Sequence, residues 1–288
     1  AVAADPVVPT VGLSGWPNYL AMGTISSGVP SSEPTDQRID SIFTYNGTGG
    51  DGDPGRIESP YKIYNMMTMG KAIRDKTGYA VNPSLVEYQW QLSGGWNPSD
   101  VEDTDRLTKH FFNLMFLADT LQTQAPELTG THGTILLSPD LLGFIGNTNR
   151  QADVEALKIN VNQAVAQASC MMTKQVDFSQ ETSCTYAWDK QQITLNGTVR
   201  DLMPWLKAKT DNYTAGMAFA DCVGGAVVAK CTNAVAPAGT PTFSNNFNGW
   251  IQAQNYLAKK YGPQVNLGWH ENISGAPGGG WWVHGGAN

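Results

Sequence analysis

The amino-acid sequence predicts an α/β protein with parallel strands, and three observations support this class. Short apolar segments alternate about six times with longer segments of helical spacing along the 288 residues, which is the rhythm of strand–helix–strand units. The apolar segments are continuous, as expected for strands that are covered on both faces. With 41% hydrophobic and only 15% charged residues, the composition suits a large core and excludes a disordered or coiled-coil chain.

The expected elements follow in order along one domain that spans residues 1–288. A Pro-rich segment at 1–18 is expected to wrap the surface. Strands are expected at 19–25, 40–45, 84–90, 133–138, 213–220 and 265–270, with a short further one at 281–284. Apolar residues spaced three and four apart predict helices at 61–76, 103–124, 151–170, 198–209 and 247–261. Gly78 and Gly262 stand where the first and last of these helices should end.

A TIM-barrel-like arrangement is favoured over an open doubly wound sheet. No G-x-G-x-x-G or Walker sequence follows the first strand, so nucleotide-binding folds lose their main support. Six or seven strands are fewer than the eight of a closed TIM barrel. The barrel is therefore expected to be distorted or incomplete: it has seven strands, or a removed segment or a second chain completes it.

Several features indicate a secreted protein, extracellular or periplasmic. The first residues, Ala-Val-Ala-Ala-Asp-Pro, resemble the product of signal-peptide removal. No apolar run is long enough to span a membrane, and a net charge of −7 argues against nucleic acid as a partner. The four cysteines lack C-x-x-C spacing, so local disulfides Cys170–Cys184 and Cys222–Cys231 are expected, since short loops close most easily. The alternative is four buried thiols. No cofactor is expected, and the four histidines show no metal-ligand spacing.

Acidic residues stand at the carboxyl ends of four predicted strands, where parallel α/β folds place their functional residues. They are Glu87, Asp140, Asp221 and Glu271. Two carboxylates across a glycosidic bond are what glycoside hydrolysis requires. For any one of these acids, the structural alternative is a helix N-cap or a loop salt bridge.

Aromatic residues accompany the acids, and aromatic faces can stack on sugar rings. For the tryptophans in loops, sugar contact and plain packing are both open. The candidate substrate-binding residues are Tyr45, Tyr88, Gln89, Trp90, Trp96, Trp269, His270, Trp281 and Trp282.

The sequence Gly-Thr-Ile-Leu-Leu-Ser-Pro-Asp-Leu-Leu-Gly at 133–143, followed by a helix with Asn-Val-Asn-Gln-Ala-Val at 160–165, resembles the family 6 glycoside hydrolases, which are cellulases. The resemblance implies that Asp140 is the general acid. Residues 86–90 resemble the family strand that carries a Tyr and a supporting Asp, and residues 218–221 resemble the strand whose Asp begins an Asp-Ala-Gly-His segment. The chain differs at Ser138, where the family has Glu, and at Gln89 and Gln91, where no supporting Asp occurs.

The main hypothesis is a secreted glycoside hydrolase that cleaves a β-linked polysaccharide such as cellulose or chitin. Asp140 would protonate the leaving oxygen, and Glu87, Asp221 or Glu271 would act as base or nucleophile, with Glu271 favoured. The second hypothesis is a non-catalytic carbohydrate-binding barrel, which the missing Asp after the third strand supports. The third is one chain of a larger secreted assembly.

Overall fold

The computed structural model describes residues 13–17, 21–25, 36, 38–46, 61–88, 90, 96–138, 140–173 and 231–269. The elements are, in order, β1 (Gly23–Ile25), β2 (Ser41–Asn46), α1 (Tyr61–Thr77), β3 (Asn82–Glu87), α2 (Ser99–Glu102), α3 (Thr104–Thr129), β4 (Thr134–Leu137), α4 (Leu141–Asn147), α5 (Gln151–Ala156), α6 (Val161–Thr173), α9 (Phe247–Tyr261) and β5 (Asn266–Trp269).

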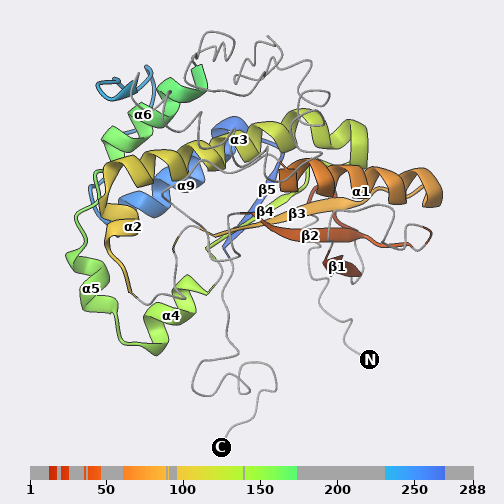
Figure 1. Cartoon of the computed structure of the whole chain (residues 1–288), viewed down its shortest axis with the longest axis horizontal. Helices are drawn as coiled ribbons and strands as arrows, with labels where there is room; N and C mark the ends of the chain where they lie inside the picture. The colour runs from red at the N-terminus through yellow and green to blue at the C-terminus, as the bar shows by residue number, and fades with distance from the viewer. Residues whose placement is uncertain are drawn as a thin grey trace, which may run out of the picture.

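The five strands form one parallel sheet in the order β1-β2-β3-β4-β5 (Figure 1). The predicted α/β class with parallel strands is therefore confirmed. Within the described residues the sheet is open, since β1 and β5 each pair with one strand only. The strands β4 and β5 pair directly, although more than 120 residues separate them in the sequence. The strands expected at 213–220 and 281–284 and the helix expected at 198–209 lie outside the described residues.

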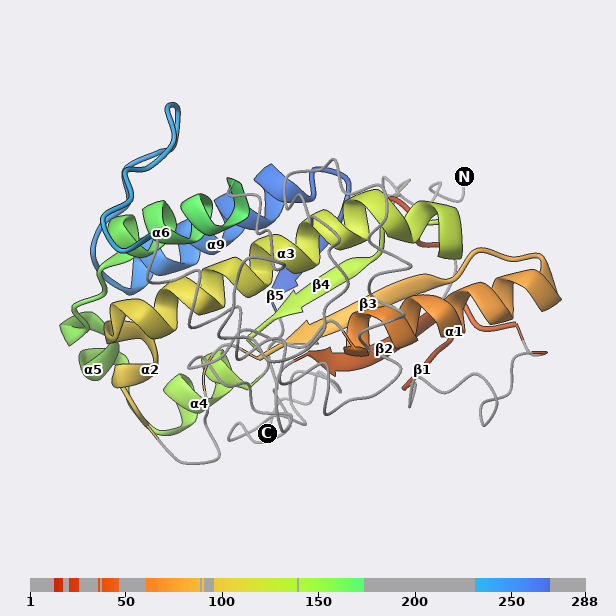
Figure 2. The same cartoon turned by 45° about the horizontal axis from the view of Figure 1, so that its top comes forward.

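The helices that connect the strands cover one face of the sheet. In a parallel sheet whose neighbours are consecutive, right-handed crossovers place every helix on the same side. Helix α1 contacts β2 and β3, α3 contacts β3, and α9 contacts β5. Figures 1 and 2 show α1, α3 and α9 along the same side of the strands. In the part of the chain that the structure describes, α1, α3 and α9 leave the other face of the sheet uncovered, and we call it the helix-free face.

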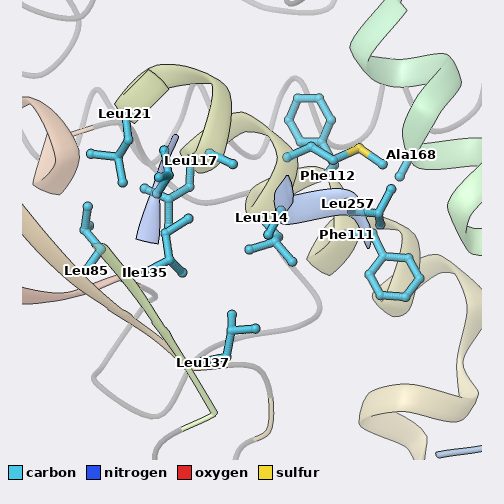
Figure 3. Packing of buried hydrophobic residues seen from close by; sticks show 14 of the residues in the cluster. Leu85, Phe111, Phe112, Leu114, Leu117, Leu121, Ile135, Leu137, Ala168 and Leu257 are labelled. Carbon is cyan, nitrogen blue, oxygen red and sulfur yellow. The ribbon is translucent and has the colours of Figure 1, made fainter. Parts of the chain in front are cut away.

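The hydrophobic core lies between the sheet and the long helix α3. Figure 3 shows Leu85, Ile135 and Leu137 of the strands pointing toward the leucines of α3. Asp103 starts α3, because its side chain accepts hydrogen bonds from the N–H groups of Asp105 and Arg106. Gly130, with φ of 90°, ends the helix in the left-handed conformation. The helix therefore runs one turn beyond the expected end at residue 124.

The helix expected at 151–170 is wrong as a single element, because the chain leaves the helix between α5 and α6. Leu157 is extended (φ −58°, ψ 136°), and both Leu157 and Ile159 are buried in the core. The N–H of Lys158 donates to Glu102 Oε1 at 2.8 Å, and the N–H of Ile159 donates to the carbonyl of Asn245 at 3.3 Å. These long-range contacts outweigh the local helical spacing.

Both expected disulfide pairings are also wrong, because Cys170 pairs with Cys231 across a sequence separation of 61. Packing brings the end of α6 beside residue 231: the side-chain amides of Gln163 and Gln167 both donate to the carbonyl of Thr232. This tertiary proximity outweighs the preference for short loops that favoured Cys170–Cys184 and Cys222–Cys231. Cys184 and Cys222 lie outside the described residues.

The described part of the Pro-rich segment contacts the sheet. Trp16 Nε1 donates to Thr134 Oγ1 at 3.0 Å, and Asn266 Nδ2 donates to the carbonyl of Ser14 at 2.7 Å. Thr134 and Asn266 are the first residues of β4 and β5, so residues 13–17 cross the amino-terminal edge of the sheet. This part of the segment blocks one end of the helix-free face.

Candidate functional site

The register of the strands decides which side chains face the helices and which face away. Neighbouring residues on a strand point to opposite faces, whereas residues paired across parallel strands share a face. One row across β2, β3 and β4 is Thr44, Leu85 and Ile135, and its Leu85 and Ile135 belong to the core. The next row belongs to the opposite, helix-free face, and it contains Tyr45, Val86, Leu136 and Gly268.

A cavity of about 590 Å³ lies on this helix-free face. Its volume is within the range of small-molecule sites, roughly 300–1,000 Å³. Its described lining comes from all of β1 to β4 and from the segments that flank them. The lining residues are Trp16, Ala21, Gly23, Ser41, Phe43, Tyr45, Ser84, Val86, Tyr88, Leu136 and Asp140.

The lining residues differ between the amino-terminal and the carboxyl ends of the strands. Ser41 lies at the amino-terminal end, and Ser84, whose hydroxyl is 3.1 Å from that of Ser41, lies in the next inward-facing row, beside Phe43. At the carboxyl end are Tyr45, Tyr88 and Asp140. The carboxyl end of the cavity, called its mouth below, therefore has two phenol rings and a carboxylate, at the edge of the sheet where parallel folds carry function.

Asp140 reaches the mouth through an unusual turn between β4 and α4. Ser138 and Asp140 both have left-handed backbones, with φ of 47° and 70°, which is uncommon for residues other than glycine. The N–H of Ser138 donates to the carbonyl of Glu87 at 3.0 Å, which ties the turn to the end of β3. Asp140 occupies the N-cap position of α4, but its side chain makes no capping hydrogen bond. The helix-cap alternative therefore does not account for this carboxylate, and such a turn is typical of functional sites.

The two tyrosines at the mouth form an aromatic pair. The rings of Tyr45 and Tyr88 have centroids 5.6 Å apart at an interplanar angle of 48°. The rings of Phe43 and Tyr45 pack edge to face, with centroids 5.9 Å apart. Tyr45 is 36% exposed, so part of its surface is available to a ligand. Rings of this kind offer an apolar face together with a hydroxyl group.

Glu87 lies apart from the cavity. It pairs in register with Leu137, a core residue, and is only 1% exposed. It therefore shares the helix-facing side of β3, opposite Val86 and Tyr88. The structure does not bring Glu87 together with Asp140 in the cavity, although both stand at strand ends. Asp221 and Glu271 lie outside the described residues.

The described tryptophans of the predicted site pack against one another on the helix side. Trp90 is 2% exposed and stacks on Trp96 with centroids 4.6 Å apart. Trp250 of α9 meets both Trp90, at 6.3 Å, and Trp269, at 5.9 Å. Trp269 Nε1 also donates to Asn255 Oδ1 at 2.9 Å. For these three tryptophans, the structure favours packing over sugar contact. Gln89, His270, Trp281 and Trp282 lie outside the described residues.

Sequence reasoning did not single out the interior of the cavity. Trp16, Ser41, Phe43, Ser84 and Leu136 line it, yet none was a candidate. The signal that could have found most of them is the period of two along 41–45 and 84–88, which places every second residue on the face of Tyr45 and Tyr88.

In the described part of the chain, no group of three or more His, Cys, Asp or Glu residues is arranged to hold a metal ion. Nor does any described helix combine the length and apolar character needed to cross a bilayer. Searches against family models, curated proteins and solved structures found no match to this chain.

Proposed function

We propose that the chain is a carbohydrate-active protein, a glycoside hydrolase in which Asp140 is the general acid. One observation carries the proposal: a cavity at the carboxyl ends of parallel strands has a carboxylate and two tyrosine rings at its mouth. Aromatic rings complement the C–H faces of sugars, and a carboxylic acid can protonate a glycosidic oxygen. The resemblance of residues 133–143 to family 6 glycoside hydrolases supports the same role for Asp140 and implies a β-linked polysaccharide such as cellulose or chitin.

Hydrolysis needs a second carboxylate, which acts as base or nucleophile. Asp140 is the only carboxylate among the described lining residues. Of the remaining candidates, Glu271 is favoured because it stands two residues after the end of β5 in the sequence; it lies outside the described residues. A separation of about 5 Å between the two carboxyl groups would give retention of configuration, and about 6.5–9.5 Å would give inversion.

The second candidate function is carbohydrate binding without catalysis. It is favoured by the single carboxylate in the described lining, beside an intact aromatic pair. The site would then hold a glycan by stacking and hydrogen bonding, and it would release no product.

The proposal extends to the closure of the fold and to its location. Consecutive strand order and one-sided helices are typical of a segment of a TIM-like barrel, so we propose that the sheet curves toward a barrel, complete in this chain or with a partner chain. The Cys170–Cys231 disulfide supports a secreted or periplasmic location, because disulfides persist in oxidising compartments.

A panel of β-linked glycans, including cello- and chito-oligosaccharides, tests the proposal. The protein is incubated with each glycan, and released reducing ends and bound glycan are measured in parallel. Release supports the hydrolase, and binding without release supports the binding protein. Neither release nor binding across the panel would refute both functions.

A further inference from the structure

We infer that Trp16 is a ligand-binding residue of the cavity, and that an oligosaccharide lies along the strands in contact with both Trp16 and the tyrosine pair. The inference rests on the proposed function, which places a glycan at the mouth. Trp16 gives this glycan a third aromatic contact, which comes from the amino-terminal segment of the chain. The ligand is therefore a chain of several sugar units and not a single sugar.

Trp16 differs from the other tryptophans that the structure describes. Those four belong to the hydrophobic core or pack against it, and they are Trp90, Trp96, Trp250 and Trp269. Trp16 lies outside this core and lines the cavity, together with Tyr45 and Tyr88. Its indole therefore has a surface that faces the space where a ligand can bind.

Hydrogen bonds hold Trp16 in place on the sheet. Its backbone N–H donates to the carbonyl of Leu13 at 3.0 Å, which closes a turn. Its indole N–H donates to Thr134 Oγ1 at 3.0 Å, so the only polar atom of the side chain is already satisfied. Asn266 Nδ2 donates to the carbonyl of the neighbouring Ser14 at 2.7 Å. The ring is thus positioned without a ligand, and such preorganisation lowers the entropic cost of binding.

The register of the strands gives the spacing between Trp16 and the mouth. Thr134, which accepts from the indole N–H, pairs with Ser84 of β3. Tyr88 is four residues beyond Ser84, just after the end of β3. Strands rise about 3.3 Å per residue, so the levels of Thr134 and Tyr88 differ by about 13 Å along the strands. One sugar ring is shorter than this distance, whereas an oligosaccharide can contact both ends.

Hydroxyl groups of the sheet accompany Trp16 in the lining. The hydroxyl of Ser41 donates to the carbonyl of Asn82 at 3.0 Å, and the hydroxyl of Ser84 donates to Asn82 Oδ1 at 3.2 Å. Both protons are therefore used within the protein, and the two oxygens can accept hydrogen bonds from a ligand. Sugars combine hydroxyl donors with apolar C–H faces, so they match an indole ring beside hydroxyl acceptors.

Radical footprinting of the full chain tests the inference without a substitution. Hydroxyl radicals oxidise accessible tryptophan side chains, and peptide mass spectrometry measures the oxidation rate with and without saturating cellohexaose or chitohexaose. We expect the bound hexasaccharide to remove most of the oxidation at Trp16. Trp269 is the matched control, because it is also half-buried and its indole also donates a hydrogen bond, but its register partner Leu137 belongs to the core. An unchanged rate at Trp16 in the complex would overturn the inference.

Substitution of Trp16 tests the same contact through affinity, which calorimetry measures. Trp16→Leu should weaken hexasaccharide binding by about tenfold or more, since both the stacking contact and the buried area of the ring are lost. Trp16→Phe keeps an aromatic ring and should retain most of the affinity. Leu13→Ala is the control in the same segment, at a residue that is 58% exposed and outside the described lining, and it should bind as the wild type does. Wild-type affinity of Trp16→Leu, folded as judged by circular dichroism, would overturn the inference.

The outcomes separate this inference from the proposed function. A hexasaccharide that binds while Trp16 stays open to oxidation overturns the inference and leaves the proposed function standing, with the glycan at the tyrosines alone. A methyl glycoside of the same sugar that binds as tightly as the hexasaccharide would overturn the placement along the strands, because one unit does not reach both contacts. If no glycan of the panel binds, the proposed function and the inference are both wrong.

Discussion

Replacing His110 with glutamine should remove a large part of the pH dependence of stability. His110 lies in α3, faces Gln254 of α9 with Nε2 3.4 Å from Oε1, and is 2% exposed. Burial lowers the pKa of His110 to about 4, against a smaller opposing effect of the contact with Gln254. In the unfolded chain, the pKa of histidine is about 6.5. The imidazole is therefore neutral in the folded protein well below the pH at which the unfolded chain gains a proton.

The magnitude follows from this difference. Above pH 6.5 the imidazole is neutral in both states, so its contribution to stability is complete. As the pH falls from about 6.5 to about 4, His110 becomes protonated in the unfolded state but stays neutral in the folded state. The free energy of unfolding therefore decreases. A difference of about 2.5 pKa units at about 1.4 kcal/mol each corresponds to about 3 kcal/mol.

Urea unfolding between pH 4 and pH 7.5 measures this loss. The wild-type free energy of unfolding should decrease by about 3 kcal/mol more than that of His110→Gln over this interval. His132→Gln makes the same substitution at a half-buried histidine whose Nδ1 hydrogen-bonds the backbone carbonyl of Gln122, and it controls for the change of side chain. Parallel curves for the wild type and His110→Gln would refute the reasoning that burial keeps His110 neutral.

Two further predictions concern the disulfide and a tight turn. Removing the Cys170–Cys231 bond by a double alanine substitution should lower the free energy of unfolding by about 4 kcal/mol, as expected for a loop of this length. Peptide mapping under non-reducing conditions should find these two cysteines linked. A peptide that links Cys170 to Cys184 would contradict the structure. Gly133→Ala should destabilise by more than about 2 kcal/mol, because Gly133 has φ of 79° and a new Cβ would lie 2.7 Å from a backbone oxygen. Gly78→Ala, with φ of 75° and open space around it, should cost only about 1 kcal/mol in the same urea assay, and equal costs would contradict the steric argument.

The elements that could be predicted are those whose signal is local and strong. Helix α9 was predicted at the residues where it lies, because its apolar periodicity is regular and Asn246 caps it, with its side chain accepting from Gly249 N–H at 3.0 Å. The five described strands were predicted to within four residues at each end. The parallel order of the sheet followed from the alternation of strands and helices.

The elements that could not be predicted depend on contacts between distant residues. The break between α5 and α6 needs Glu102 and Asn245 to supply hydrogen bonds to Lys158 and Ile159. The disulfide needs the end of α6 to lie beside residue 231. Local spacing contains no information on either contact, so the sequence favoured a continuous helix and short disulfide loops.

The sequence indicated some residues of the candidate site and misplaced others. Strand ends directed attention to Asp140, Tyr45 and Tyr88, and the structure places all three in the lining of one cavity. The same rule grouped Glu87 with them, although alternation along β3 places it on the other face from Tyr88. Applying the period of two would have separated these neighbours. No such rule applies to Trp90, because it follows the strand and its packing against Trp250 is a tertiary contact.

The central claim is that the Asp140 carboxylate performs chemistry at the cavity mouth. The measurement that tests it most directly is the rate of reducing-end release from the glycan that the panel identifies, for the wild type, Asp140→Asn and Asp105→Asn. Asp105 is an exposed residue of α3, so its variant controls for the change of charge. We predict that Asp140→Asn lowers kcat by about 10²–10⁴ with glycan binding retained, and that Asp105→Asn keeps the wild-type rate. Full activity of Asp140→Asn would contradict the claim.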